Sequence, residues 1–205
     1  MKSFKSEFVE MFHNKGYLQK KIGEIMSISR GASPRPISNF VTNEEDGINW
    51  IKIGDVSEDS LYIEQTAEKI TKDGAEKSRY VKPGDFILSN SMSFGRPYIL
   101  KIHGCVHDGW LILSNYETSF NQFFLYYALR DDDVQNQFEG NANGATVRNL
   151  NSDIVKAVSV IVPPLNLQNQ FAAFAQQIDK SKFVVKQQIA DLQELLDSKM
   201  QEYFS

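Results

Sequence analysis

The sequence predicts an α+β fold: a mixed, largely antiparallel β-rich domain followed by a long C-terminal helix of the coiled-coil type. Two observations predict it. Short apolar segments follow one another with turn residues between them, as hairpin strands do, rather than alternating regularly with helices. After a Val-Pro-Pro-Leu corner at 162–165, apolar residues recur in steps of three or four with no Gly or Pro between them. A doubly wound parallel sheet fits this order less well.

The chain begins with a predicted short helix over residues 4–12, because the apolar residues at 4, 8, 11 and 12 share one helical face. Gly16 follows where a glycine stop ends a helix. We therefore expect residues 1–16 to form a short N-terminal helical segment. The β-rich domain is then expected to occupy residues 17–162.

Five strands and one helix are predicted within this domain. The strands are predicted at 48–53, 85–89, 97–102, 109–113 and 157–162. The first of them alternates in polarity, as a half-buried strand does, and is followed by Gly54. Between residues 120 and 138 the apolar positions instead recur at helical spacing, and a loop follows at 139–144.

The last segment, 163–205, is predicted to be helical over roughly 40 residues, about 60 Å at 1.5 Å per residue. Its apolar side chains form a stripe on one face, which is typical of a seam for another helix. The predicted dimer interface consists of Phe171, Phe174, Ile178, Val185, Ile189, Leu192 and Leu196. The alternative is a helix that folds back over its own domain. The average helix has only about 11–12 residues, which favours a spacer or a dimerisation arm.

Composition limits the class of protein. The 205 residues carry a formal net charge of −4, which permits one globular domain with an appendage or two small domains. The acidic balance argues against a protein that coats nucleic acid, although a recognition surface needs only local positive charge. Cys105, the single cysteine, allows no intramolecular disulfide. No apolar run approaches the roughly 20 residues of a membrane span. We expect a cytoplasmic protein without a membrane partner.

Enzymatic motifs are missing from the sequence. It contains no phosphate-binding P-loop, no G-x-S-x-G elbow and no H-E-x-x-H. The corner at 162–165 is similar to the Asn/Asp-Pro-Pro-aromatic motif of amino-methyltransferases, but it lacks both the polar and the aromatic residue. His103, Cys105 and His107 alternate as metal ligands on one strand face would, yet no fourth ligand is near. We therefore predict no catalytic residue, no metal and no cofactor.

Three polar loops, at 30–35, 89–96 and 140–149, combine arginine with short hydrogen-bonding side chains. Arginine suits phosphates and guanine, and asparagine suits adenine. Any one such loop is more often an ordinary turn, but their joint presence indicates DNA recognition. The segment 107–110 is a weaker candidate, because Trp110 is expected in the core. Including His107 from that segment, the predicted DNA-binding residues are Arg30, Ser33, Arg35, Ser91, Ser93, Arg96, His107, Asn141, Asn143, Thr146 and Arg148.

In their order along the chain, several segments resemble the DNA-specificity (S) subunits of type I restriction-modification systems. The resemblance extends from residue 17 to residue 204. It is carried by a lead-in at 18–25, a Gly-x-x-Pro loop at 31–34, a strand at 50–55, and the segments at 81–89, 144–150 and 163–170.

This resemblance implies a target-recognition domain at 17–162 followed by a conserved helix. The full subunit of that family carries two such units, whose helices pair antiparallel, and each domain reads one half of a bipartite DNA site. This chain has one unit and looks like a half-subunit, so a homodimer would restore the arrangement about a two-fold axis. The implied partners are double-stranded DNA, modification (methyltransferase) subunits and restriction subunits, with methylation and cleavage left to those subunits.

A weak internal similarity between residues 6–12 and 198–204 fits a repeated unit, since both segments share Ser, Glu and Phe with apolar residues between. Two other interpretations stay open. The chain could be a fragment of a DNA-modifying enzyme, either a methyltransferase or a nuclease. It could also be a coiled-coil adaptor that does not bind DNA.

Overall fold

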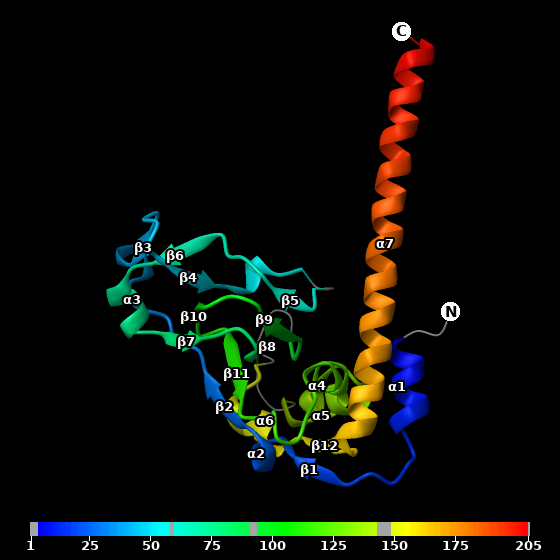
Figure 1. Cartoon of the computed structure of the whole chain (residues 1–205). Helices are drawn as coiled ribbons and strands as arrows, with labels where there is room; N and C mark the ends of the chain where they lie inside the picture. Colours follow the sequence, from blue (N-terminus) through cyan, green and yellow to red (C-terminus); the bar gives the residue numbers. More distant parts are fainter. Residues whose placement is uncertain (1–3, 58–59, 91–93, 143–148, 205) are drawn as a thin grey trace.

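The computed structural model describes residues 4–57, 60–90, 94–142 and 149–204. Across this part of the chain, the strands form two five-stranded sheets and one two-stranded ribbon. The sheets and a group of short helices make up one body, and the long helix α7 (Leu165–Phe204) rises out of it with the C-terminus at its far end (Figure 1). None of the described helices combines the length and apolar character of a membrane span.

The first sheet is buried on both faces at its centre. In spatial order its strands are β2 (Ser27–Arg30), β11 (Trp110–Ser114), β8 (Phe86–Ser89), β9 (Pro97–Leu100) and β5 (Tyr62–Ile63). The three central strands are almost entirely buried, which explains why they appear in the sequence as continuous apolar runs. Neighbouring strands are antiparallel except β9 and β5, which are parallel.

The second sheet packs against one face of the first. Its strands are, in order, β3 (Val41–Thr42), β6 (Glu68–Ile70), β4 (Ile48–Ile51), β10 (Gly104–Val106) and β7 (Arg79–Val81). Ile51 and Val106 of this sheet share one apolar cluster with Ile87, Leu100 and Trp110 of the first. The connections around it contain the 3-10 turns η1 (Ile37–Asn39) and η2 (Ile53–Asp55) and the short helix α3 (Lys72–Glu76).

Helices cover the opposite face of the first sheet. They are α1 (Phe4–Phe12), α2 (Ile22–Ile25), α4 (Gln122–Leu129), α5 (Asp132–Ala142) and α6 (Ser152–Ala157), with the ribbon strands β1 (Gln19–Lys21) and β12 (Ser159–Ile161) beside them. Their apolar residues join Phe86, Leu111 and Leu113 of the first sheet in one large buried cluster. The body therefore consists of three layers, two of strands and one of helices.

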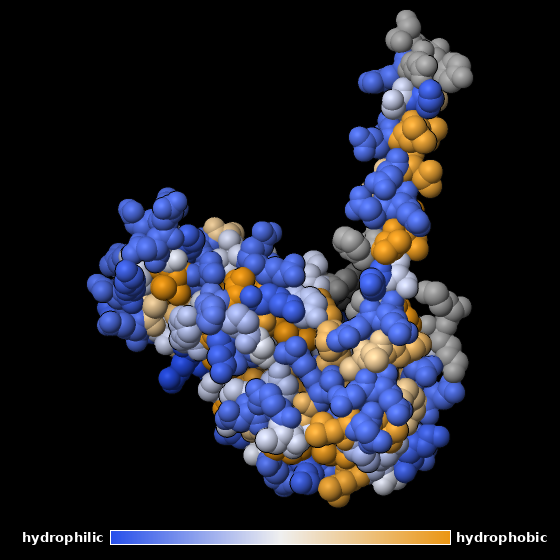
Figure 2. All heavy atoms as spheres, viewed as in Figure 1, coloured by the Kyte–Doolittle hydropathy of each residue, from blue (hydrophilic) through white to orange (hydrophobic). Residues whose placement is uncertain are grey.

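Two regions of α7 differ in burial. In its first three turns Phe171, Ala172 and Ala175 are buried in the body. From residue 180 onward, every side chain that the structure describes is exposed. Apolar residues gather along this outer part of the helix (Figure 2).

The buried start of α7 is held by aromatic rings from two other helices. The centroid of the Phe171 ring lies 5.4 Å from that of Phe8 and 5.6 Å from that of Phe12, both on α1. The ring of Phe124 on α4 lies 6.5 Å away, and each of these three pairs meets edge to face. The prediction that Phe171 belongs to the dimer interface is therefore wrong, because its side chain is 0% exposed within its own chain.

The single helix predicted over 120–138 is two helices, α4 and α5. Asn121 caps the first, because its side-chain oxygen accepts the backbone N–H groups of Phe123 and Phe124 at 2.9 and 3.3 Å. Asp131 accepts the backbone N–H of Asp133 at 3.1 Å at the start of the second. A capping residue lies outside the helical conformation, so the helix breaks at Asp131.

The predicted strands occur with shifted ends. The strand predicted at 48–53 ends at Ile51, because Lys52 begins a turn in which its backbone N–H donates to Asp55 Oδ2 at 2.7 Å. The strand predicted at 157–162 begins only at Ser159, because α6 continues to Ala157. The ends of the other three differ by no more than two residues.

Replacing Phe171 by Ala tests the aromatic junction. We expect the free energy of unfolding to fall by about 3–5 kcal/mol, because the substitution empties a closely packed site between three helices. Urea unfolding followed by circular dichroism measures this loss. The matched control is Leu195→Ala on the same helix, whose side chain is 57% exposed. An equal loss in both variants would contradict the packing described above.

Candidate nucleic-acid interface

Two of the predicted polar segments meet at the end of the first sheet. The segment after β2 crosses the connection between β10 and β11, where the Gly31 backbone N–H donates to the Trp110 carbonyl at 2.8 Å. The Ala32 N–H donates to the Val106 carbonyl at 3.1 Å. A Cβ at Gly31 would lie 2.1 Å from the carbonyl oxygen of His107, so only glycine permits this approach.

Asp108 lies at the centre of this meeting point. Its Oδ1 accepts a hydrogen bond from Ser33 Oγ at 2.8 Å, and its Oδ2 pairs with Arg35 Nη2 at 3.1 Å. Its main-chain carbonyl accepts hydrogen bonds from Arg30 Nε at 2.9 Å and from Asn90 Nδ2 at 2.8 Å. We call these five residues, Arg30, Ser33, Arg35, Asn90 and Asp108, the Asp108 cluster.

The cluster carries two guanidinium groups and one carboxylate. The Ser33 hydrogen bond, together with the nearby charge of Arg35, lowers the pKa of Asp108 below its ordinary value, so the carboxylate is ionised at neutral pH. The side chain of Arg35 is 80% exposed, and that of Asp108 is 39% exposed. The surface therefore offers one strongly exposed cation that is held by a half-buried acid.

Asn90 connects the cluster to a third segment. Its side chain is buried, its backbone N–H donates to the Gly109 carbonyl at 3.0 Å, and its carbonyl accepts the Leu150 N–H at 2.7 Å. The chain entering the loop 89–96 and the chain leaving the loop 140–149 are thus joined here. All three predicted polar loops have at least one end at the Asp108 cluster.

His107 stabilises the connection between β10 and β11. Its ring lies between Trp50 and Trp110, at centroid distances of 6.2 and 6.4 Å. Its Nδ1 accepts the Gly109 backbone N–H at 2.6 Å. Burial lowers the pKa of His107 and outweighs the opposing influence of Asp108 and Asp55.

The remaining predicted DNA contacts fall into two groups. Ser91, Ser93, Asn143, Thr146 and Arg148 lie outside the described residues. Arg96 is half-buried where its hairpin closes, its backbone N–H donating to Ser89 Oγ at 3.1 Å, and Asn141 is exposed in the last turn of α5. Asp108 and Asn90 lie within the candidate segments 107–110 and 89–96, but neither was predicted as a contact. A polar residue directly after the buried strand β8 was the available signal for Asn90, whereas nothing in the sequence links Asp108 to a serine 75 positions away.

The sequence matches the profile of a known protein family. The profile of the type I restriction modification DNA specificity domain matches residues 14–194. The chain belongs to this family.

Solved structures are similar to this specificity domain in fold. A chain from a structure of complex assembly and conformational transition in the type I R-M system matches with a TM-score of 0.70 and 21% identity, over 92% of this chain and 46% of its own. The HsdS subunit from Thermoanaerobacter tengcongensis matches with a TM-score of 0.65 and 19% identity, over 90% and 44%. The S subunit of a type I restriction-modification system from M. genitalium gives 0.57 and 13%, over 94% and 47%.

These matches confirm the predicted α+β class with its long C-terminal helix. This specificity domain spans less than half the length of each of the three chains.

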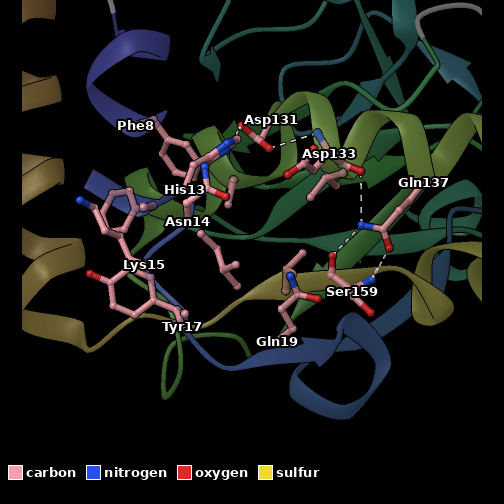
Figure 3. A pocket seen from close by; sticks show the side chains of 16 residues that line it. Phe8, His13, Asn14, Lys15, Tyr17, Gln19, Asp131, Asp133, Gln137 and Ser159 are labelled. Carbon is pink, nitrogen blue, oxygen red and sulfur yellow. Dashed lines mark hydrogen bonds and ion pairs between the residues drawn. The ribbon is translucent and has the colours of Figure 1, made fainter. Parts of the chain in front are cut away.

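The specificity domain also has a cavity near α1, away from the Asp108 cluster. It is a cavity of about 250 Å³ between the end of α1, the start of α5 and the ribbon (Figure 3). Gln137 closes one side, its Nε2 donating to the Ser159 carbonyl at 3.0 Å and its Oε1 accepting the Ser159 N–H at 2.8 Å. Its lining is mixed, with Phe8 and Tyr17 beside polar groups.

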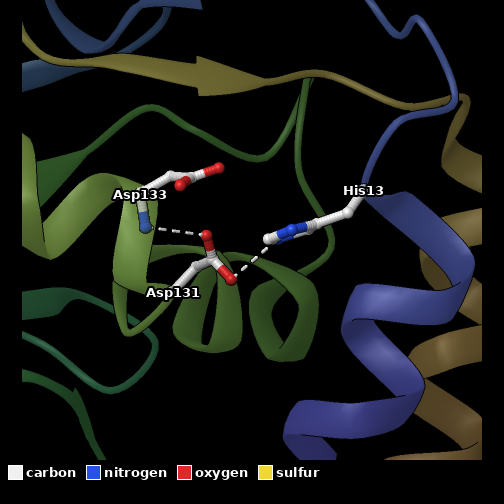
Figure 4. Close-up of side chains that lie close together, drawn as sticks. All are labelled: His13, Asp131 and Asp133. Atoms are coloured by element: carbon white, nitrogen blue, oxygen red, sulfur yellow. Dashed lines mark hydrogen bonds and ion pairs between the residues drawn. The ribbon is translucent and has the colours of Figure 1, made fainter.

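Three possible metal ligands gather at the rim of this cavity. Potential ligand atoms of His13, Asp131 and Asp133 lie within 4.8 Å of one another (Figure 4). Both Asp131 oxygens already have partners, since Oδ2 pairs with His13 Nε2 at 2.9 Å and Oδ1 caps α5. A helix cap and the hydrogen-bonding contact between His13 and Asp131 account for this arrangement, and Asp133 is exposed. We assign no metal to it.

The histidine environment predicts a pH dependence of stability. The pKa of His107 is lowered from its ordinary 6.5, so the unfolded chain binds a proton more readily than the folded one. Stability is therefore lost as pH falls below about 6.5, and His107→Gln should show a smaller loss between pH 7.5 and 5.5 than the parent. Urea unfolding at the two pH values measures it. His103→Gln, which changes an exposed histidine, should retain the parent's loss. Identical slopes in all three proteins would contradict the assignment.

Proposed function

We propose that this chain recognises DNA as the specificity subunit of a type I restriction-modification complex and dimerises through α7 to read a bipartite inverted site. The observation that carries this proposal is the family match over residues 14–194. In functional terms, 17–162 would be the target-recognition domain and 163–205 the helix for dimerisation and spacing. Residues 1–16 would be a short N-terminal helix. The complex would work in the cytoplasm.

The Asp108 cluster supports a DNA-binding face at the end of the first sheet. Arginine donates both to phosphates and to the major-groove edge of guanine, and Arg30 and Arg35 stand together on this face. The loops that contain Ser91, Ser93, Asn143, Thr146 and Arg148 connect to the same face through Asn90 and Leu150. We propose that they supply further contacts to double-stranded DNA.

Catalysis would belong to partner subunits. Modification (methyltransferase) subunits would methylate the DNA and restriction subunits would cleave it, while this chain catalyses nothing and holds no cofactor. The corner at 162–165 lacks the polar and aromatic residues of the amino-methyltransferase motif, which supports this division. A chain with a formal net charge of −4 gains little from phosphate attraction alone, so we expect the modification subunits to supply much of the affinity.

The outer half of α7 supports a second copy as its partner. Val185, Ile189, Leu192 and Leu196 are 52–65% exposed and lie on one face of the helix. An isolated helix is marginally stable in water, and its stability comes mainly from packing of an apolar face. Together with the half-buried Phe174 and Ile178 nearer the body, these residues form the proposed dimer seam.

The spacing of the seam has a two-fold pattern. Its four outer residues are separated by steps of four, three and four, a pattern that is the same in both chain directions. If the two-fold axis passes between residues 190 and 191, Ile189 faces Leu192 of the second copy and Val185 faces Leu196. Antiparallel pairing therefore brings the four outer seam residues of one copy against those of the other.

Charge supports the same orientation. Residues 180–190 contain three lysines and no acid, whereas residues 191–201, which pair with them, contain three acids and one lysine. Antiparallel pairing about that axis sets each basic half against an acidic half. Parallel pairing would set like charges together, which is unfavourable along a coiled coil.

DNA binding should depend on assembly. We expect weak binding of a random-sequence duplex pool by the chain alone and tight, selective binding after the modification subunits of its system are added. Fluorescence anisotropy and sequencing of the retained duplexes measure both. Arg35→Ala should weaken binding in the assembled complex by about 1–3 kcal/mol, whereas Lys72→Ala, an exposed lysine outside the Asp108 cluster, should not.

Equal affinity with and without the modification subunits would contradict this proposal. Calorimetry separates it from the alternatives. Binding of S-adenosylmethionine by the isolated chain would favour an enzyme fragment. A coiled-coil adaptor would show no DNA affinity even with the modification subunits present.

The orientation of the dimer can be tested by disulfide cross-linking. In the antiparallel register Ser181 faces Met200 of the second copy, so Ser181→Cys and Met200→Cys chains should cross-link when co-expressed and oxidised. Neither variant should cross-link alone. The native Cys105 is buried and should give little background. Non-reducing electrophoresis measures the product.

Charged substitutions provide the control. Ile189→Glu with Leu192→Glu should abolish the cross-link and yield monomers in sedimentation velocity. Ser198→Glu with Gln201→Glu adds the same charge to exposed positions on the opposite face and should leave it intact. Cross-linking by either cysteine variant alone would indicate parallel pairing. A parent chain that stays monomeric at micromolar concentration would remove the dimer altogether.

A further inference from the structure

An acidic residue at the centre of a DNA-binding face is unexpected. A carboxylate repels phosphates, and most hydrogen bonds from proteins to DNA go to phosphate and sugar. Yet Asp108 stands between two arginines, both of which hydrogen-bond to it. The presence of Asp108 there needs a physical reason other than affinity for the phosphate backbone of DNA.

A contribution to fold stability does not account for an acidic side chain at position 108. The Asp108–Arg35 ion pair joins a 39% exposed group to an 80% exposed group, and such exposed pairs contribute little to stability. The main-chain carbonyl of Asp108, rather than its carboxylate, accepts the hydrogen bonds from Arg30 and Asn90. A neutral side chain of the same shape would leave those two contacts in place.

The carboxylate does fix the position of Arg35. Its Oδ2 holds the guanidinium at 3.1 Å, while Ser33 donates to Oδ1 and also accepts the Asp108 backbone N–H at 3.3 Å. The carboxylate is thereby held by the same loop that carries the arginine. A guanidinium that is already oriented loses less conformational freedom when it meets a base edge.

The same charge reduces attraction to DNA of any sequence. Arg30 and Arg35 together carry two positive charges, and Asp108 cancels one of them within hydrogen-bonding distance. Nonspecific binding depends on the number of phosphates neutralised, whereas specific binding also depends on oriented base contacts. A carboxylate in this place therefore lowers nonspecific binding to DNA while it supports specific binding.

We propose that Asp108 is a positioning residue that determines specificity: it orients Arg35 for a base edge and weakens the attraction of this face for DNA phosphates. This inference rests on the proposed DNA-recognition function. Arg35 is the group that touches DNA, and Asp108 acts through it.

The test compares Asp108→Asn with the parent in the assembled complex with modification subunits. Asparagine retains the shape and the main-chain contacts but removes the charge. We expect the ratio of affinities for a duplex selected by the parent and for a scrambled duplex to fall about tenfold, through weaker binding of the selected duplex together with tighter binding of the scrambled duplex. The dependence of log K on log salt for that duplex should steepen by about one ion.

Asp46→Asn is the matched control, because Asp46 is also an exposed aspartate paired with a cation, Lys72, and lies outside the Asp108 cluster. Its discrimination ratio and salt slope should equal the parent's. A double-mutant cycle with Arg35→Gln identifies the route: if Asp108 orients Arg35, Asp108→Asn should change the ratio less in the Arg35→Gln background than in the parent, because only its effect on phosphate attraction remains. A merely structural role would lower the melting temperature without this coupling.

Each outcome decides the inference. A discrimination ratio that changes less than twofold in Asp108→Asn, with the parent complex still selecting a sequence, overturns the role of Asp108 and leaves the proposed function intact. An equal change in the Arg35→Gln background also overturns it. A parent complex that binds selected and scrambled duplexes alike removes the proposed function as well. Should Asp108→Asn fail to fold, an Arg35→Gln complex that keeps the parent's ratio overturns the inference by itself.

Discussion

The aromatic junction at the start of α7 is the contact on which the rest of the arrangement depends. Phe171 packs edge to face against rings from α1 and α4, and none of its side chain reaches solvent. Because α4 belongs to the helical layer that covers the first sheet, this packing fixes the direction in which α7 leaves the body. A spacer helix can set the separation of two DNA-binding faces only if its first turns are held rigidly in the domain.

Polar contacts extend this rigidity to the Asp108 cluster. Asn90 is buried at the end of β8, and its hydrogen bonds reach both Gly109 and Leu150. His107 braces the same connection between two tryptophan rings. The ends of the loops that carry the proposed DNA contacts are therefore held by buried groups. This arrangement allows the rest of each loop to vary in sequence while its ends keep one position.

Sequence periodicity predicted the parts of the fold whose burial pattern is continuous. The period of three and four after the Pro-Pro corner predicted α7, and apolar runs predicted β8, β9 and β11 to within two residues. Strands such as β1, whose three residues are all exposed, have no such pattern and were missed. Their pairing is set by the backbone of a distant segment, which the sequence does not encode locally.

The incorrect assignment of Phe171 and the unpredicted position of Asp108 have a similar cause. Phe171 lies on the same stripe as the outer seam residues, and the stripe itself does not indicate where the body ends and the free helix begins. Its burial depends on rings more than 150 positions away on α1. The central position of Asp108 was not predicted, because its partners Ser33 and Arg35 lie more than 70 residues earlier in the chain. Periodicity reports which face of an element is apolar, but only tertiary contacts decide what covers that face.

The proposed dimer places a constraint on the DNA site. In a single chain with two recognition domains, the two half-sites can differ, because each domain has its own loops. In a dimer of identical chains, both copies of the Asp108 cluster are the same and are related by the two-fold axis between residues 190 and 191 of the paired helices. The half-sites must then be inverted repeats of one sequence. Two arms that cross near residue 190 also fix one distance between the faces, and adjacent major-groove segments recur every ~34–36 Å. The stripe and the charge order of α7 would thus determine the spacer of the DNA site, although no residue of the seam touches DNA.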